Sequence, residues 1–342
     1  MSKLIATAMT ACLLAGAAAA ADFDYFHKTY ADAEKVARKE GKPLYLHFTT
    51  TWCGWCRRIE NDVYKKPEGK KALSPFVCAS LDCTRPRGEK PSKTTAFNLD
   101  LMRKYGGSGY PFLVMVTPDG DVLHRIGGYK PLPAFEKELA KAGENFKKLK
   151  AFQAYAAKAD KSGYEYNAKA LAFYGATGSW DKAALAAGAV RKLDPEFKRG
   201  LAALVSFAAL QVEKSEDDAK LRALEDEVIR HDPKNAEGYL EKALWGRAAR
   251  AQGTAARTGD EKLKKAKTQE AIDAISLLLK KAEKLADRAD VYGFLGWLNM
   301  KAGRRDQAIA AMEKSIELDP KGPRVGMLKG LIEQLKKAKA EK

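Results

Sequence analysis

The chain has 342 residues and a formal net charge of +17. This length allows two domains, and a core of that size needs no disulfide staples. Residues 1–140 carry 21 Lys and Arg against 15 Asp and Glu, and the remainder carries 40 against 29. Because a nucleic-acid-binding protein concentrates its excess charge in one stripe, we expect no nucleic-acid partner. A solvated, lysine-rich helical surface is the main interpretation of the charge; anionic partners or an anionic membrane face are the alternative.

The first 21 residues have the pattern of a secretory signal peptide. Lys3 precedes an apolar, alanine-rich run, and we expect cleavage after Ala19 or Ala21. An uncleaved anchor and a lipid attached at Cys12 are the alternatives. The mature protein is therefore expected to be periplasmic or secreted, in a compartment where disulfides persist.

Residues 22–142 alternate helix and strand patterns. Helices are expected over residues 30–42, 56–68, 97–107 and 132–142. Strands are expected over residues 43–51 and 75–83, and a hairpin over residues 110–129 turns at Pro118-Asp119-Gly120. Alternation of this kind builds an α/β layer structure.

Three motifs in this region resemble the thioredoxin family. They are Trp52-Cys53-Gly54-Trp55-Cys56, Tyr110-Pro111 before an apolar strand, and Gly127-Gly128 after the hairpin. The likeness covers about residues 25–140 and is greatest to extracytoplasmic thioredoxin-like proteins with a WCGWC motif. It implies an α/β domain with a central mixed sheet flanked by helices, a cis Tyr110–Pro111 peptide, and thiol-disulfide oxidoreductase activity.

The expected chemistry rests on the two cysteines of this motif. A CxxC pair at a strand-to-helix junction places Cys53 at the helix N-terminus, where unpaired amides and the helix dipole favour the thiolate. The pKa of such a thiol falls below the ~8.5 of a free cysteine. Cys53 is thus the expected nucleophile and Cys56, one turn later, the resolving thiol. No cofactor is expected beyond the redox-active Cys53–Cys56 disulfide, and the expected partners are protein thiols and disulfides, with a membrane redox donor as a further candidate.

The residues around the sulfurs are candidates for substrate binding. Trp52 and Trp55 would form an apolar rim, with ordinary packing as the alternative. Pro111 has no N–H group, and a cis bond there would leave neighbouring backbone free to pair with a substrate chain. The expected substrate-binding residues are Trp52, Gly54, Trp55, Tyr110, Pro111 and Gly128.

Cys78 and Cys83 offer a metal-site alternative, because they could join the CxxC pair as zinc ligands. Five extended steps separate them by ~16 Å, which argues against a shared metal and against a Cys78–Cys83 disulfide. We therefore expect no metal. Cys78 is expected to be a small buried apolar residue, and Cys83 a free thiol at the mouth of the next loop.

Two features depart from the usual thioredoxin pattern. His47 lies six residues before Cys53, where thioredoxins usually carry a buried acid, and on the strand face opposite Leu46 and Phe48. It could relay protons for Cys56 with a pH response near neutrality, or be a hydrogen-bonded core histidine. The second feature is a long link over residues 84–98, which would shape substrate choice or be a plain solvated loop. Its basic residues are Arg85, Arg87, Lys90 and Lys93.

From residue 143 to 342 the pattern is entirely helical. Residues 289–320 resemble a tetratricopeptide repeat, and Asp-Pro also ends two earlier segments, at Pro195 and Pro233. The positions that carry this resemblance are Tyr292, Leu295, Gly296, Ala308 and Pro320. Weaker helix pairs are expected over residues 164–195, 197–233 and 235–287, with a polar insert over residues 251–267 and a capping helix over residues 323–340. A nearly continuous helix from the closing helix of the first domain would bridge to them.

A tetratricopeptide-like helical solenoid offers a concave surface for a protein or peptide partner, although it could also only stabilise or space the first domain. The sequence thus favours a periplasmic thiol-disulfide oxidoreductase that acts on protein disulfides, with the reductase direction preferred. The alternative is a non-catalytic scaffold or chaperone whose thioredoxin-like domain binds peptides. Retention of both cysteines of the CxxC pair and of Pro111 argues against that alternative.

Overall fold

The computed structural model describes residues 24–85, 88–213, 215, 217–282, 285 and 288–340. The expected signal peptide and Arg87 lie outside these residues. The chain divides into two compact units between Ala151 and Phe152. In the part of the chain that the structure describes, no helix has the length and apolar character needed to cross a membrane.

The first unit is built on a mixed five-stranded sheet, as expected. Its strands are β1 (Phe26–His27), β2 (Leu44–Thr49), β3 (Val77–Asp82), β4 (Phe112–Val116) and β5 (Val122–Gly127). The strand order is β1-β3-β2-β4-β5, with β1, β3 and β2 parallel and β4 and β5 antiparallel to their neighbours. The sequence did not predict β1, whose two residues are too few for a periodic pattern.

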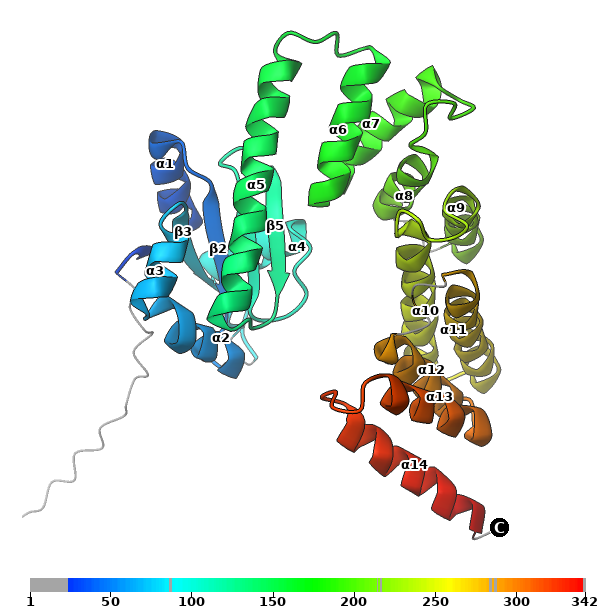
Figure 1. Ribbon diagram of the computed structural model, residues 1–342. Coiled ribbons are helices and arrows are strands. Elements are labelled where there is room, and N and C mark those ends of the chain that lie inside the picture. The colour runs from blue at the N-terminus through cyan, green and yellow to red at the C-terminus, as the bar shows by residue number, and fades with distance from the viewer. Residues whose placement is uncertain are drawn as a thin grey trace, which may run out of the picture. The chain divides into compact units, whose positions relative to one another are not determined.

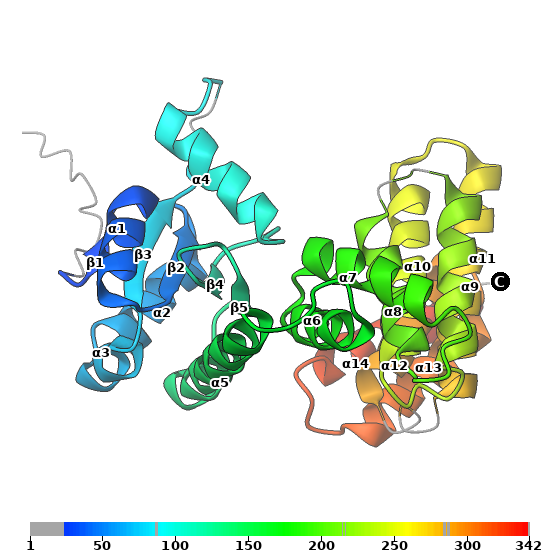
Figure 2. The same ribbon diagram turned by 90° about the horizontal axis from the view of Figure 1, so that it is seen from above.

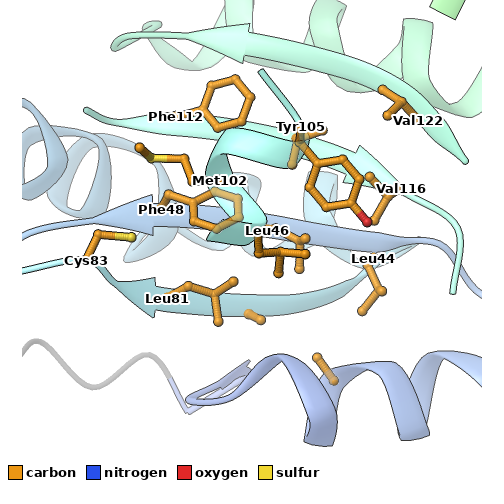
Figure 3. Close-up of a cluster of buried hydrophobic side chains, with 14 of the residues drawn as sticks. Leu44, Leu46, Phe48, Leu81, Cys83, Met102, Tyr105, Phe112, Val116 and Val122 are labelled. Atoms are coloured by element: carbon orange, nitrogen blue, oxygen red, sulfur yellow. The ribbon is translucent and has the colours of Figure 1, made fainter. Parts of the chain in front are cut away.

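Helices cover both faces of this sheet. They are α1 (Tyr30–Glu40), α2 (Gly54–Ile59), the π-helix η1 (Glu60–Tyr64), α3 (Pro67–Leu73), α4 (Lys93–Lys104) and α5 (Leu132–Ala156). Figure 2 shows α1 and α4 on one side of the strands and α2, α3 and α5 on the other. Alternate residues of β2 therefore face two different cores, and Leu44, Leu46 and Phe48 lie in the one that contains α1 and α4 (Figure 3).

The single helix expected over residues 56–68 is wrong. The structure has α2, then η1, and then a new helix that begins at Pro67. Lys66 is extended, with φ −91° and ψ 140°, because the residue before a proline is excluded from the helical region. The proline ring is suited to the first position of α3, where no N–H is needed.

The link after β3 is shorter than the sequence suggested. α4 begins at Lys93 and not near Phe97, because the Ser92 side chain accepts a hydrogen bond from the Thr95 amide and caps the helix. The link therefore covers residues 83–92, and Lys93 belongs to the helix.

The second unit is a series of paired helices, which confirms the expected all-α region. The pairs are α6 (Tyr164–Thr177) with α7 (Trp180–Leu193), α8 (Ala202–Val212) with α9 (Asp218–His231), α10 (Tyr239–Arg257) with α11 (Glu261–Lys281), and α12 (Ala289–Lys301) with α13 (Arg305–Leu318). Figure 1 shows these pairs and the final helix α14 (Val325–Ala340). The polar insert expected over residues 251–267 is instead helical at both ends, since only residues 258–260 separate α10 from α11.

The Asp-Pro pairs of the sequence have a structural explanation in two of the turns. The buried Asp194 carboxylate accepts hydrogen bonds from the amides of Lys198 and Arg199, at 3.0 and 2.9 Å. Asp232, also buried, accepts from three backbone amides within residues 237–240. Each carboxylate therefore satisfies backbone donors that would otherwise be unpaired between one helix pair and the next.

The pair whose sequence resembles a tetratricopeptide repeat, α12 with α13, is packed closely at Gly296. A Cβ atom at this position would lie 2.6 Å from Cγ of Met312 and 3.1 Å from the Ala308 carbonyl oxygen. Both distances are shorter than normal van der Waals contact, so the helices can approach only because position 296 has no side chain.

Candidate redox site

Cys53 lies directly after the turn that follows β2. Its amide donates to the Thr50 carbonyl oxygen at 3.1 Å, and the residue is the N-cap of α2 with φ −76° and ψ 101°. Its Sγ accepts a hydrogen bond from the Cys56 amide at 3.1 Å. The Cys56 amide, in the first turn of α2, thus points at the Cys53 sulfur. A hydrogen bond from this amide stabilises the Cys53 thiolate when the pair is reduced.

Cys53 and Cys56 form a disulfide, with their Cα atoms 5.2 Å apart. Both residues are almost covered, whereas the two tryptophans beside them are 65% (Trp52) and 55% (Trp55) exposed. Neither indole is therefore packed in the core. Trp52 instead rests edge-on against Tyr110, with ring centroids 5.6 Å apart.

Of the other predicted substrate-binding residues, Gly54 is the first residue of α2, and Tyr110, Pro111 and Gly128 lie in loops. The Tyr110–Pro111 peptide is cis, and the Gly128 amide donates to the Pro111 carbonyl oxygen at 2.9 Å. Gly128 has φ +72°, a conformation that glycine adopts without a steric cost. A side chain at Gly54 would meet only the Arg57 guanidinium, at 4.0 Å. The contact of Tyr110 with Trp52 links the Tyr110–Pro111 peptide to the CxxC turn, and the role of these residues in substrate binding stays a prediction.

A cluster of side chains that the sequence analysis missed surrounds Trp55. The Tyr129 ring packs on the Trp55 ring at 5.6 Å, and the Arg58 guanidinium lies 5.5 Å from the Trp55 centroid and 5.0 Å from that of Tyr129. The Tyr129 hydroxyl donates to Asp62 at 2.8 Å, and Arg58 pairs with the same carboxylate at 3.3 Å. The Tyr129 hydroxyl and then Arg58 hold the pKa of Asp62 below its usual value. Tyr129 follows Gly127-Gly128 and Arg58 follows the CxxC pair, but spacing alone does not reveal their contact.

His47 lies at the centre of β2, fully buried, on the sheet face that α2 and α5 cover. Its ring is 5.3 Å from that of Tyr64. Neither ring nitrogen has a hydrogen-bond partner among the described residues, so the expected hydrogen-bonded core histidine is wrong. Burial lowers the pKa of His47 from 6.5 to about 3, which also contradicts a pH response near neutrality. The imidazole is neutral at neutral pH, and a proton-relay role stays a prediction.

Among the described residues, the two remaining cysteines of this unit, Cys78 and Cys83, are buried free thiols. Cys78 is a small buried apolar residue, as expected, and burial raises the pKa of its thiol well above the usual range. Cys83 is, as expected, a free thiol where the next loop begins, but it is buried inside the apolar cluster beside Phe48 and Leu81 (Figure 3). Burial raises the pKa of Cys83 to about 11, against a smaller lowering effect of its contact with Tyr110.

The zinc arrangement considered for the four cysteines is not formed. Cys53 and Cys56 are bonded to each other, and within the described ranges no group of three or more His, Cys, Asp or Glu side chains is placed to hold a metal.

The basic link after β3 starts beside the CxxC turn. The Thr51 amide donates to the Thr84 hydroxyl at 2.8 Å, which ties the two loops together. Arg85, Lys90 and Lys93 are all exposed. The link thus presents cations to solvent from a position next to the redox site.

Comparison with known proteins supports this description of the first unit. Residues 30–143 match the sequence profile of a family described as a thioredoxin-like domain. The disulfide bond reductase DsbH of Chlamydia pneumoniae is 27% identical over 102 residues, which are 29% of this chain and 61% of that protein. The thiol:disulfide interchange protein DsbD 2 of Pseudomonas aeruginosa is 29% identical over 86 residues, which are 25% of this chain and 13% of that protein. The chain thus spans less than two thirds of the length of these relatives.

Solved structures are also similar to this part of the chain. A DsbH oxidoreductase structure is 23% identical and covers 35% of this chain and 87% of its own, with a TM-score of 0.29. The strand order, the position of the disulfide at the start of α2 and the family match together make residues 30–143 a thioredoxin-like domain.

Proposed function

We propose that the chain is a thiol-disulfide oxidoreductase that acts on protein disulfides, in the reducing direction. The observation that carries the proposal is the Cys53–Cys56 disulfide at the N-terminus of α2, between two exposed tryptophans. The similarity to a disulfide bond reductase and to a thiol:disulfide interchange protein supports the reaction class, and the first of these names supports the direction.

The reaction follows from the placement of the two sulfurs. In the reduced protein, the Cys53 thiolate attacks one sulfur of a substrate disulfide, forms a mixed disulfide and releases the other substrate sulfur as a thiolate. Cys56, one turn further along α2, then attacks the Sγ of Cys53. This step releases the second substrate thiolate and restores the Cys53–Cys56 disulfide, so two electrons have passed to the substrate. An external thiol reductant returns the pair to the dithiol form.

The remaining parts of the proposal concern location and partners. A protein that reduces disulfides outside the cytoplasm meets them where they form, which agrees with the signal-peptide pattern of residues 1–21. The paired helices of residues 152–342 act as a tetratricopeptide-like array that recruits a protein partner. The close packing at Gly296 against Ala308 and Met312 supports this assignment, because such repeats pair their helices through small residues.

A turbidity assay of insulin disulfide reduction with dithiothreitol as the electron source tests the activity. We expect the parent chain to accelerate precipitation of the insulin chains, and Cys53→Ser to abolish the acceleration. A parent chain that is as slow as Cys53→Ser, and nevertheless binds unfolded peptides, would support the non-catalytic scaffold instead.

A reduction potential measured against glutathione tests the direction. A potential well below that of glutathione agrees with a reductase, whereas one well above it indicates an oxidant.

A further inference from the structure

We propose that Tyr129, Arg58 and Asp62 fix Trp55 as an aromatic platform beside Cys53, and that this platform selects substrates with an apolar side chain next to the reactive cysteine. The inference rests on the proposed function and goes beyond it by naming a substrate feature and the residues that read it. Tyr129, Arg58 and Asp62 are positioning residues, since they act through Trp55.

The platform is built from two separate parts of the fold. Trp55 and Arg58 belong to α2, whereas Tyr129 follows β5. The Trp55 and Tyr129 rings are tilted by only 30° with centroids 5.6 Å apart, and the Arg58 guanidinium lies near both rings. A planar guanidinium that contacts two aromatic rings restrains all three side chains at once.

Trp55 is exposed and yet in contact with neighbouring side chains. An indole that is 55% exposed would usually exchange between rotamers and lose entropy when a ligand binds to it. The contacts with Tyr129 and Arg58 hold Trp55 in place before the substrate arrives. A large apolar surface that is both exposed and held rigid is typical of a recognition site.

The charge of the cluster distinguishes an apolar substrate side chain from an acidic one. A free arginine beside the reactive sulfur would favour an acidic substrate segment. Arg58, however, is paired with Asp62, which also accepts the Tyr129 hydroxyl hydrogen bond. The cluster is therefore neutral as a unit and presents ring surface, which favours an aliphatic or aromatic side chain over a carboxylate.

Two disulfide-bonded peptides that differ only beside one cysteine, with Leu in one and Asp in the other, test the inference. The parent chain should reduce the Leu peptide with the higher kcat/KM, by a factor of roughly 5. In Tyr129→Ala this preference should fall close to unity through a higher KM for the Leu peptide, while kcat changes little. Tyr129→Phe keeps the ring stack and should retain most of the preference.

Phe97→Ala is the matched control, because Phe97 is another exposed aromatic residue of the same domain, 50% exposed, and packs on Tyr30 instead. It should leave the preference as in the parent. A parent chain that reduces both peptides equally, or a Tyr129→Ala variant that keeps the full preference, would overturn the inference alone. A parent chain that reduces neither peptide nor a small aromatic disulfide would overturn the proposed function, and the inference with it.

Discussion

Replacing His47 by leucine should remove much of the acid sensitivity of the thioredoxin-like domain. The folded-state pKa of His47 is about 3, whereas that of an unfolded histidine is about 6.5. Between these two values the unfolded chain binds a proton at His47 that the folded chain does not, so stability falls as the pH falls through this window. From about pH 7.5 to about pH 5, this single group removes roughly 2 kcal/mol of the free energy of unfolding.

The variant should therefore lose roughly 2 kcal/mol less than the parent between the two pH values. At the higher pH it should be at least as stable, because leucine fills a similar volume without two unpartnered ring nitrogens. Because the loss measured for the variant is subtracted from the loss measured for the parent, the effects of the titrating groups that the two proteins share cancel.

The assay must report on this domain and not on the helical array. Cys78 and Cys83 provide the signal, since both are buried free thiols of the first unit and react only when it opens. Urea titrations can be followed with a pyridyl disulfide reagent, which remains reactive toward thiols in acid, and labelling at these two residues is read by mass spectrometry. Equal losses of stability in parent and variant would refute the assigned burial of a neutral imidazole.

Three further predictions test the site, the array and the division between the units. Cys56→Ser should trap substrates as mixed disulfides on Cys53, visible on non-reducing gels; alkylation at position 56 alone in the reduced parent would contradict these roles. Gly296→Ala should cost about 1–3 kcal/mol of unfolding free energy, measured by urea and circular dichroism, whereas Gly188→Ala, where a Cβ meets nothing within 4 Å, should cost nothing. A chain that ends at Ala151 should reduce a small disulfide at close to the full-length rate but fail to capture the partners of the full chain; capture of the same partners would show that the helical array does not select them.

The cysteine chemistry was predictable because it depends on local pattern. A strand followed by CxxC places Cys53 at the start of a helix whatever the rest of the chain does, and the structure has it there. The helix pairs were predictable for a similar reason, since each is marked by its own periodicity and three of the four by Asp-Pro at their end. The sheet order follows from the resemblance and not from any local signal.

What the sequence did not predict depends on contacts between distant residues. Cys83 follows directly on a strand, and its burial depends on neighbours such as Phe48 that sequence spacing does not place. The contact of Arg58 with Tyr129 joins residues that lie 71 positions apart. The start of α4 at Lys93 is different, because it depends on a local feature and not on distant contacts. Ser92 caps the helix, but the polar residues around it made this segment look like part of the loop.

The burial of Cys78 and Cys83 has a consequence for the fidelity of exchange. An oxidoreductase that keeps spare thiols risks pairing them with its own active disulfide or with a passing substrate. Here burial raises the pKa of both groups, to about 11 for Cys83, so neither is ionised to a useful extent at neutral pH. Under the proposed function, burial therefore leaves Cys53 and Cys56 as the pair that exchanges electrons, among the four cysteines of the thioredoxin-like domain.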